Sequence, residues 1–224
     1  MQILYITPSP PNSMSRIRTQ NIIKAMQKLG HQVTLVSFVY NDNDISTLKK
    51  CSSYIEDIKW VKQPKWKSMF KCLLGLLLPI PLRVLYCNSS KMKNTIERCL
   101  IEKDYDLIYI KRLRMAQYAY LGRQKHITTI VDITDSLTKY YERISKKESG
   151  WKKLLDYEEY YKHRIYEPKM CKHNAPIVIC SEDDKNYLTD IDSELNNNIF
   201  VMNNSIETSI WLSDAVVTAV EGER

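Results

Sequence analysis

Short apolar runs rich in β-branched residues alternate with segments of helical periodicity along most of the chain. The runs are continuous rather than alternating, which is typical of strands that are buried on both faces. Between the first two runs, apolar residues recur at the spacing of one helix face from Ile22 to Leu29, and Gly30 then gives a stop signal. The seven predicted strands are Ile3–Ile6, Val33–Phe38, Ile58–Val61, Leu107–Ile110, Thr128–Val131, Ile177–Cys180 and Ile199–Met202. Buried strands joined through helices predict an α/β domain with a doubly wound parallel sheet.

A long helical stretch from Lys139 to Lys172 mixes aromatic residues with charges of both signs. Single-stranded nucleic acid is bound by basic stripes interleaved with aromatic residues. Six acidic residues interrupt any such stripe here: Glu142, Glu148, Asp156, Glu158, Glu159 and Glu167. We therefore interpret the stretch as a pair of helices that packs on the sheet by its aromatic face, and we expect no nucleic-acid partner.

The composition is that of a folded chain with a basic surface. The 224 residues are 44% hydrophobic and 26% charged, enough to bury the core of one large or two small domains. Lysine and arginine number 33 against 26 acidic residues, which gives a net charge of +7. This charge favours an anionic partner, namely a nucleic acid, a phosphorylated small molecule or an acidic lipid headgroup, although a solvated lysine-rich surface explains it as well.

The six cysteines show no C-x-x-C pairing and no histidine at zinc spacing. We interpret them as reduced core residues of a cytosolic protein. No two of the four histidines are spaced like metal ligands, so we expect no metal site. We also expect no bound cofactor. The first residues, MQILYI, lack a basic leader and a cleavage site, which indicates a first strand rather than a signal peptide.

The loop after the first strand combines features that suit a phosphate or a polyhydroxylated ligand. Three prolines stiffen it, serines are available to cap helix amides, and arginines bring positive charge to a helix N-terminus. Ligands of doubly wound sheets bind at such places, beyond the carboxyl ends of the strands. A plain connection with solvated arginines remains open on these features alone. The candidate ligand-binding residues of the loop are Ser13, Ser15, Arg16 and Arg18.

The segment ILYITPSPPNSMSRIRTQNIIKAMQKLGHQVTLVSF resembles the start of the amino-terminal domain of family-4-type glycosyltransferases of the GT-B fold. The resemblance is to the sugar transferases of bacterial surface-polysaccharide pathways in particular. Four later segments fit in the same order, so that the match spans residues 1–208: DLIYIKRLRMAQYAY, IVDITDSLTKYYER, IVICSEDDKNYL and IFVMNNSIET. Met14 and Ser15 stand where the family usually has two glycines, so the backbone approaches a diphosphate less freely.

The resemblance implies transfer of a sugar from a nucleotide-sugar donor to a glycan or lipid-linked acceptor, with retention at the anomeric carbon and without a bound metal. In that family the nucleotide sugar binds mainly to a second α/β domain, which we expect to be absent from this chain because it ends at Arg224. Residues 1–208 are then the acceptor-side domain, which is either a catalytically incomplete fragment or an acceptor-binding module that needs a partner chain carrying the second domain.

Residues 209–224 form a short tail of different composition. Its last residues, DAVVTAVEGER, contain no Lys, Asn, Ile or Tyr, although these residues are frequent before Ser209. We interpret the tail as a non-native terminal segment. A short terminal helix that packs on the domain is the alternative.

The resemblance and the strand ends together select acidic candidates for catalysis. Asp132 and Asp135 follow the predicted strand Thr128–Val131, at a place where many relatives carry a functional His or Asp. A carboxylate there could hydrogen-bond the acceptor and assist its deprotonation. Ser136 is a candidate for substrate binding. The alternative is that Asp135 or Ser136 only caps the helix that starts at about Leu137.

Three more residues follow strand ends in the same way. Arg112 and Arg114 are candidates for contact with an acceptor phosphate or sugar, and surface ion pairs are the alternative. Glu182 either contacts the ligand or lies in the first turn of a helix.

The segment from Pro64 to Tyr86 is apolar with lysines near its start. Its uncharged run is too short and too proline-rich to span a bilayer, but it could lie on an anionic membrane surface and bring a lipid-linked acceptor to the site. A core helix packed on the sheet is the alternative. The candidate membrane contacts are Lys65, Trp66, Lys67, Phe70 and Lys71. We accordingly expect a cytoplasmic protein that is peripheral on the inner face of the cell membrane. A non-enzymatic module that binds membranes or acceptors is the second hypothesis for function.

Overall fold

The computed structural model describes residues 1–11, 17–174 and 176–204. Its core is one seven-stranded sheet in which every neighbouring pair of strands is parallel. The strands are β1 (Gln2–Thr7), β2 (Gln32–Val39), β3 (Asp57–Lys62), β4 (Leu107–Lys111), β5 (Thr128–Thr134), β6 (Ile177–Ile179) and β7 (Ile199–Val201). The predicted doubly wound α/β domain is therefore confirmed. Cys180 and Met202, predicted as strand residues, lie just beyond the ends of β6 and β7.

The strand order is β3-β2-β1-β4-β5-β6-β7, so β1 lies inside the sheet with β2 and β4 beside it. Side chains of β1 alternate between two apolar layers: Ile3 and Tyr5 belong to one cluster, Leu4 and Ile6 to the other. All four are buried. Burial on both faces is the physical reason that the strand reads as a continuous apolar run.

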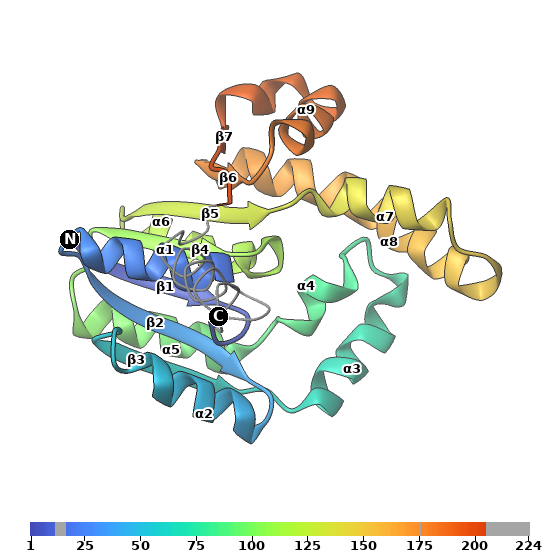
Figure 1. The fold of residues 1–224 in the computed structure, drawn as a ribbon. Helices are drawn as coiled ribbons and strands as arrows, with labels where there is room; N and C mark the ends of the chain where they lie inside the picture. The colour runs from blue at the N-terminus through green and yellow to red at the C-terminus, as the bar shows by residue number, and fades with distance from the viewer. Residues whose placement is uncertain (12–16, 175, 205–224) are drawn as a thin grey trace, which may run out of the picture.

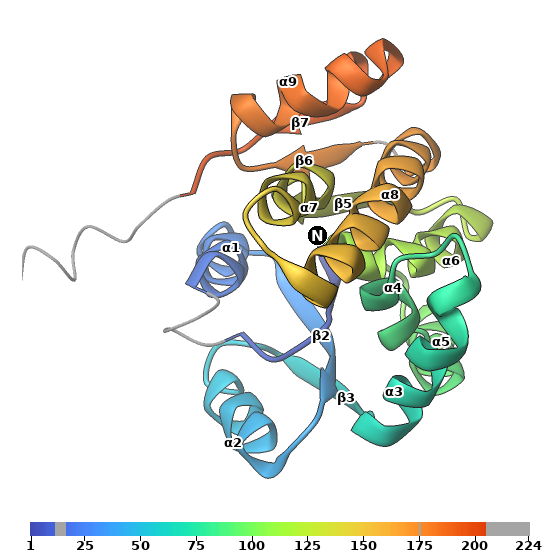
Figure 2. The ribbon, with the colours of Figure 1, turned by 90° about the vertical axis from the view of Figure 1, so that its right-hand side faces the viewer.

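Helices cover both faces of the sheet, and Figure 2 views the molecule along the strands. Helices α1 and α2 lie on one face, and α5 and α6 lie on the other. The α-helices are α1 (Ile17–Lys28), α2 (Asp42–Cys51), α3 (Lys65–Leu74), α4 (Leu82–Tyr86), α5 (Ser90–Glu102), α6 (Ala119–Gln124), α7 (Leu137–Ser145), α8 (Gly150–His173) and α9 (Glu182–Ile191). Short 3-10 helices are η1 (Gly75–Leu77), η2 (Leu113–Tyr118) and η3 (Ser193–Asn197).

The predicted helical pair is α7 and α8, which pack along each other and extend past the carboxyl ends of the strands (Figure 1). One part of that prediction is wrong. The first half of α8 lies beyond the sheet, so Trp151, Tyr157 and Tyr161 are exposed instead of packing on it. The aromatic residues of this stretch therefore do not form one buried face.

Some expectations fall outside the described residues. The loop residues Ser13, Ser15 and Arg16 are among these, as is the tail at 209–224.

Candidate functional site

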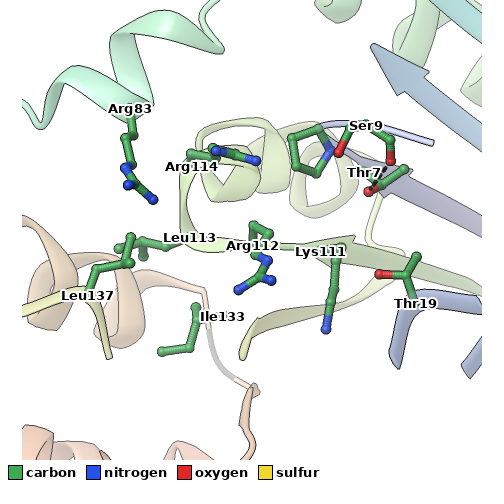
Figure 3. Close-up of a pocket in the computed structure, with 11 residues that line it drawn as sticks. Thr7, Ser9, Thr19, Arg83, Lys111, Arg112, Leu113, Arg114, Ile133 and Leu137 are labelled. Atoms are coloured by element: carbon green, nitrogen blue, oxygen red, sulfur yellow. Dashed lines mark hydrogen bonds between the residues drawn. The ribbon is translucent and has the colours of Figure 1, made fainter. Parts of the chain in front are cut away.

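The loops that follow β1 and β4 leave neighbouring strands in opposite directions, because the chain order of the strands reverses between these two. Such a reversal is where doubly wound sheets bind their ligands. A cavity of about 280 Å³ lies there (Figure 3). Its lining comes from the ends of three strands and from α1, α4, η2 and α7: Thr7, Pro8, Ser9, Thr19, Arg83, Lys111, Arg112, Leu113, Arg114, Ile133 and Leu137.

Asp132 lies beside the cavity, inside the sheet, where it is fully buried. Its carboxylate accepts hydrogen bonds from several side chains. Its Oδ2 accepts from Lys111 Nζ at 2.7 Å and from the Tyr109 hydroxyl at 2.8 Å. Arg18 Nε lies 3.4 Å from the same oxygen, and Thr134 Oγ1 donates to Oδ1 at 3.2 Å. The register of β4 and β5 pairs Lys111 with Asp132, and this explains their contact.

The cluster keeps its charges at neutral pH. Burial would raise the pKa of Asp132, but the charges and hydrogen bonds of Lys111 and Arg18 outweigh it, and the pKa of this carboxyl is lowered. Burial lowers the pKa of Lys111 to about 8, although the nearby carboxylate opposes the change. At pH 7 the pair is therefore an ammonium and a carboxylate. Asp132 is thus fully buried and engaged by these donors, and it does not line the cavity.

Asp135 lies at the surface, where its side chain is 53% exposed. A tight turn sets its position: Asp135 donates its N–H to the Ile133 carbonyl at 3.0 Å, and Thr134 between them has a φ of +71°. Positive φ is strained for a β-branched residue, and such strain gathers at functional sites. The Asp135 carboxylate faces Arg112 Nη1 at 3.4 Å and lines a second cavity of about 540 Å³.

Ser136 and Glu182 take different places. Ser136 is the N-cap of α7; its Oγ accepts from the Lys139 N–H at 3.3 Å and donates to Glu167 at 3.2 Å. It also lines the second cavity, although it is buried. Glu182 is exposed in the first turn of α9, whose N-cap is Ser181, and it lines neither of these two cavities. The capping alternative therefore describes Ser136, but not Asp135.

Two of the arginines that the sequence selected line the first cavity, whereas Arg18 does not and Arg16 is outside the described residues. Arg112, which has a φ of +75°, and Arg114 follow β4 and line the first cavity. Arg18 reaches across the carboxyl edge, where its Nη1 donates to the Met202 carbonyl and to Asn204 Oδ1, both at 2.8 Å. It thereby links α1 to the end of β7.

Arg83 on α4 also lines both cavities, and our sequence analysis did not select it. The only signal was one charge inside the apolar stretch PIPLRVLY. Its guanidinium lies over the ring of Tyr141, 5.6 Å from the ring centroid, a cation–π geometry that restrains the side chain.

Helix α8 supports the site through buried polar residues that the sequence analysis also missed. Glu159 Oε1 accepts from the Leu82 N–H at 3.0 Å, and Lys162 Nζ donates to the Gly75 and Leu76 carbonyls at 3.2 and 3.0 Å. Glu167 accepts from the N–H groups at the start of α7 at 3.0 and 2.8 Å. One helix therefore fixes the start of α4 and the start of α7.

One group of potential metal ligands occurs among the described residues: Asp135, Cys180 and Asp184, with ligand atoms within 4.8 Å of one another. Both carboxylates already have cationic partners. Arg112 lies 3.4 Å from Asp135, and Lys139 lies 3.4 Å from Asp184. Burial and the nearby Asp135 raise the pKa of Cys180 to about 11, which disfavours the thiolate that a metal needs.

Helix α3 carries the proposed membrane contacts. Trp66, Met69 and Leu73 are 68%, 65% and 65% exposed at the spacing of one helix face. Lys71 is exposed and donates to the Asn88 carbonyl at 2.8 Å. The side chains of Lys65, Lys67 and Phe70 are outside the described part of the structure. Within that part, no helix is long and apolar enough to span a bilayer.

No protein-family model and no curated protein matches this sequence. Solved structures match its fold. UGT2 of Phytolacca americana, solved with UDP-2-fluoro-glucose and pterostilbene, has a TM-score of 0.59 at 10% identity over 93% of this chain and 54% of its own. A UDP-glucosyltransferase from Polygonum tinctorium has a TM-score of 0.56 at 8% identity, over 92% of this chain and 53% of its own.

A third match is a Listeria monocytogenes protein assigned as a UDP-N-acetylglucosamine 2-epimerase. It gives a TM-score of 0.55 at 11% identity, over 89% of this chain and 44% of its own. The chain thus spans about half the length of each of these three structures. The domain has the fold of one Rossmann-like half of the GT-B glycosyltransferases.

Proposed function

We propose that the chain is the acceptor-side domain of a retaining glycosyltransferase of family-4 type, of the kind that builds bacterial surface polysaccharides. The observation that carries this proposal is the cavity where the strand order reverses between β1 and β4. Its acceptor is a glycan or a lipid-linked glycan. The co-substrate is a nucleotide sugar, held mainly by a second domain such as the other half of the matched structures. A partner chain can supply that half.

In this proposal Asp135 hydrogen-bonds the acceptor hydroxyl and assists its deprotonation, because it is the exposed carboxylate of the second cavity that follows a strained turn. Asp132, our other catalytic candidate, acts indirectly by orienting Lys111 and Arg18. The acceptor oxygen bonds to the anomeric carbon as the bond to the diphosphate breaks. Cations and helix N-termini stabilise the leaving diphosphate, so the proposal involves no metal.

The remaining candidates are proposed to contact substrate from the rim of this site. Ser136 contributes its hydroxyl from the second cavity, and Glu182 approaches from α9. The loop residues Ser13, Ser15, Arg16 and Arg18 are proposed to bind the substrate as well.

Acceptor binding tests the proposal most directly. We would titrate the chain by isothermal calorimetry with oligosaccharide and polyprenyl-linked acceptor analogues and with nucleotide sugars. Leu137 lines both cavities, so Leu137→Trp should fill part of their space and reduce acceptor affinity at least tenfold. Leu29→Trp is the matched control, because Leu29 is exposed beside the start of β2, at the opposite edge of the sheet.

We expect the wild-type chain and Leu29→Trp to bind an acceptor equally, without donor turnover by the chain alone. Loss of binding in Leu137→Trp together with an unchanged melting temperature would support the site. If no carbohydrate or glycolipid binds, or if Leu137→Trp binds as tightly as the wild type, the proposal fails.

A membrane-surface module, without catalysis, is the second candidate function. The exposed apolar face of α3 favours it, and so does the net charge of +7. Under either function we propose that the protein is cytoplasmic and peripheral on the inner face of the membrane. Flotation with phosphatidylglycerol vesicles tests this: the double variant Trp66→Ala with Leu73→Ser should lose binding, and Leu29→Ser should keep it. Equal flotation of all three proteins would exclude α3 as the contact.

A further inference from the structure

The first cavity has a one-sided charge. Four of its lining residues are cationic, namely Arg83, Lys111, Arg112 and Arg114, and none of its described lining residues is acidic. Figure 3 shows Arg83 on α4, and the other three side chains follow one another along the chain from the end of β4 into η2. A small cavity lined in this way attracts an anion.

Two of these four charges are already compensated. Lys111 contacts the buried Asp132 at 2.7 Å, and Arg112 faces Asp135 at 3.4 Å. Arg83 and Arg114 have no acidic side chain within ion-pair distance in the described part of the chain. The cavity therefore carries excess positive charge at two guanidinium groups.

Arg114 adds an independent sign of a missing ligand. Its Nε is buried and has no hydrogen-bond partner among the residues that the structure describes. Leaving such a donor unsatisfied is costly, and more so for a charged group, so native structures rarely tolerate it without a ligand or water. A bound anion would accept this hydrogen bond and would neutralise the charge.

The groups are also fixed in advance. Arg83 lies over the Tyr141 ring, and the N–H of the preceding Leu82 is held by Glu159 at 3.0 Å. Arg112 has the strained φ of +75°, and its N–H is bonded to the Asp132 carbonyl at 2.7 Å. Fixed guanidinium groups lose little entropy on binding, and their planar fork matches the oxygens of phosphate.

The volumes of the two cavities indicate which part of the ligand carries the anion. The cavity of about 280 Å³ is slightly smaller than typical ligand sites, which span about 300–1,000 Å³, and suits a headgroup rather than a whole glycan. The cavity of about 540 Å³ shares Arg83, Arg112 and Leu137 with it and contains Asp135. An anion in the first cavity would thus leave the rest of the ligand beside the Asp135 carboxylate.

We propose that the acceptor carries a phosphate ester, bound by Arg83 and Arg114 in the first cavity. This inference rests on the proposed acceptor-side function and narrows its substrate class. The phosphate can belong to a soluble sugar phosphate or to a lipid-linked glycan, because the cavity recognises the phosphoryl group that both share.

Calorimetry with four probes tests the inference: glucose 1-phosphate, farnesyl phosphate in neutral detergent micelles, UDP, and methyl glucoside as the uncharged reference. We expect at least one phosphate ester to bind ten times more tightly than methyl glucoside, with an affinity that falls as salt is added. Binding of glucose 1-phosphate alone would identify a soluble acceptor. Stronger binding of farnesyl phosphate would identify a lipid-linked one.

The double variant Arg83→Gln with Arg114→Gln should weaken phosphate-ester binding at least tenfold and leave methyl glucoside binding unchanged. The control is Arg98→Gln with Arg164→Gln, which removes two arginines outside both cavities. Thermal melts of both variants verify folding. Phosphate binding that survives the first pair of substitutions would overturn the inference.

Two further outcomes separate this inference from the proposed function. If glycans bind without preference for phosphate, the inference fails and the acceptor-side function stands. If UDP binds more tightly than the sugar phosphate and displaces it, the cavity takes the donor diphosphate and the inference also fails. Phosphate binding without any glycan selectivity would instead retain the anion site and contradict the acceptor-side function.

Discussion

Replacing Asp132 by Asn tests the buried charge cluster beside the cavity. The amide keeps the size of the side chain and one acceptor oxygen, but it removes the charge that Lys111 and Arg18 face at 2.7 and 3.4 Å. Removing one partner of a buried ion pair costs about 3–5 kcal/mol when the other charge is trapped. Lys111 is not trapped as a cation, because its pKa is already lowered to about 8 and it can become neutral by releasing its proton.

Deprotonation of Lys111 limits the loss of unfolding free energy that the substitution causes at pH 7. The interval between a pKa of about 8 and pH 7 is one unit, and one unit corresponds to about 1.4 kcal/mol, the largest loss that Lys111 itself can contribute at this pH. The weaker hydrogen bonds from Tyr109 and Arg18 add about 1–2 kcal/mol. We therefore expect Asp132→Asn to lower the free energy of unfolding by about 2–3 kcal/mol at pH 7.

The pH dependence has a definite sign. Above pH 8 the wild-type Lys111 is increasingly neutral, so Asp132 loses its nearest cationic partner and the difference between the two proteins should narrow by about 1.4 kcal/mol from pH 7 to pH 9. Urea unfolding followed by circular dichroism at both values measures it. The exposed pair Lys93–Glu97 provides the control, since Glu97→Gln should change stability by less than about 0.5 kcal/mol. A difference that does not change between pH 7 and pH 9 would refute this account of the pair.

Two other substitutions test how the site is supported. Glu167→Ala should lower the free energy of unfolding by about 2–4 kcal/mol, because it leaves the N–H groups at the start of α7 without their acceptor, whereas Glu167→Gln should cost less; the same unfolding assay measures both. Gly122→Ala should cost about 1–3 kcal/mol, since its methyl group would lie 2.7 Å from Ile108 Cδ1 and closer still to Thr129 Oγ1, and a lower melting temperature would report it.

The exposed Glu182 in the first turn of α9 is the control for Glu167, and its replacement by Ala should change stability by less than about 0.5 kcal/mol. Equal losses at the two glutamates would contradict the capping role of Glu167. A Gly122→Ala protein as stable as the wild type would mean that α6 moves away from β5 at no cost.

The sheet was predictable because its strands are buried on both faces, and strands of this kind appear in the sequence as continuous apolar runs. The neighbourhood of the site was predictable for a related reason: Arg112 and Asp135 follow directly after the ends of β4 and β5, and parallel strands end at one edge. The roles of the individual side chains could not be predicted from the sequence. Whether Asp132 faces the cavity or the inside of the sheet depends on the register of β4 and β5, which no local pattern encodes.

Arg83 and the glutamates of α8 were missed for a different reason. Leu82 and Glu159 make their contact across 77 residues of chain. Nothing around either residue indicates the other, because the contact exists only once α8 has packed beside α4. In a helix with many charged residues, the sequence does not distinguish a buried acidic residue from a solvated one.

The position of β1 inside the sheet has a consequence for how the protein is made. One edge of β1 pairs with β2, which follows within the first 39 residues, but the other edge waits for β4, which begins at Leu107. At a synthesis rate of about 5–20 residues per second, the ribosome needs roughly 3–14 seconds to make the chain between them. During that time an apolar strand with an unpaired edge is exposed on the nascent chain. The interval is a window for chaperone binding or for aggregation, and it closes only when about half of the chain has emerged.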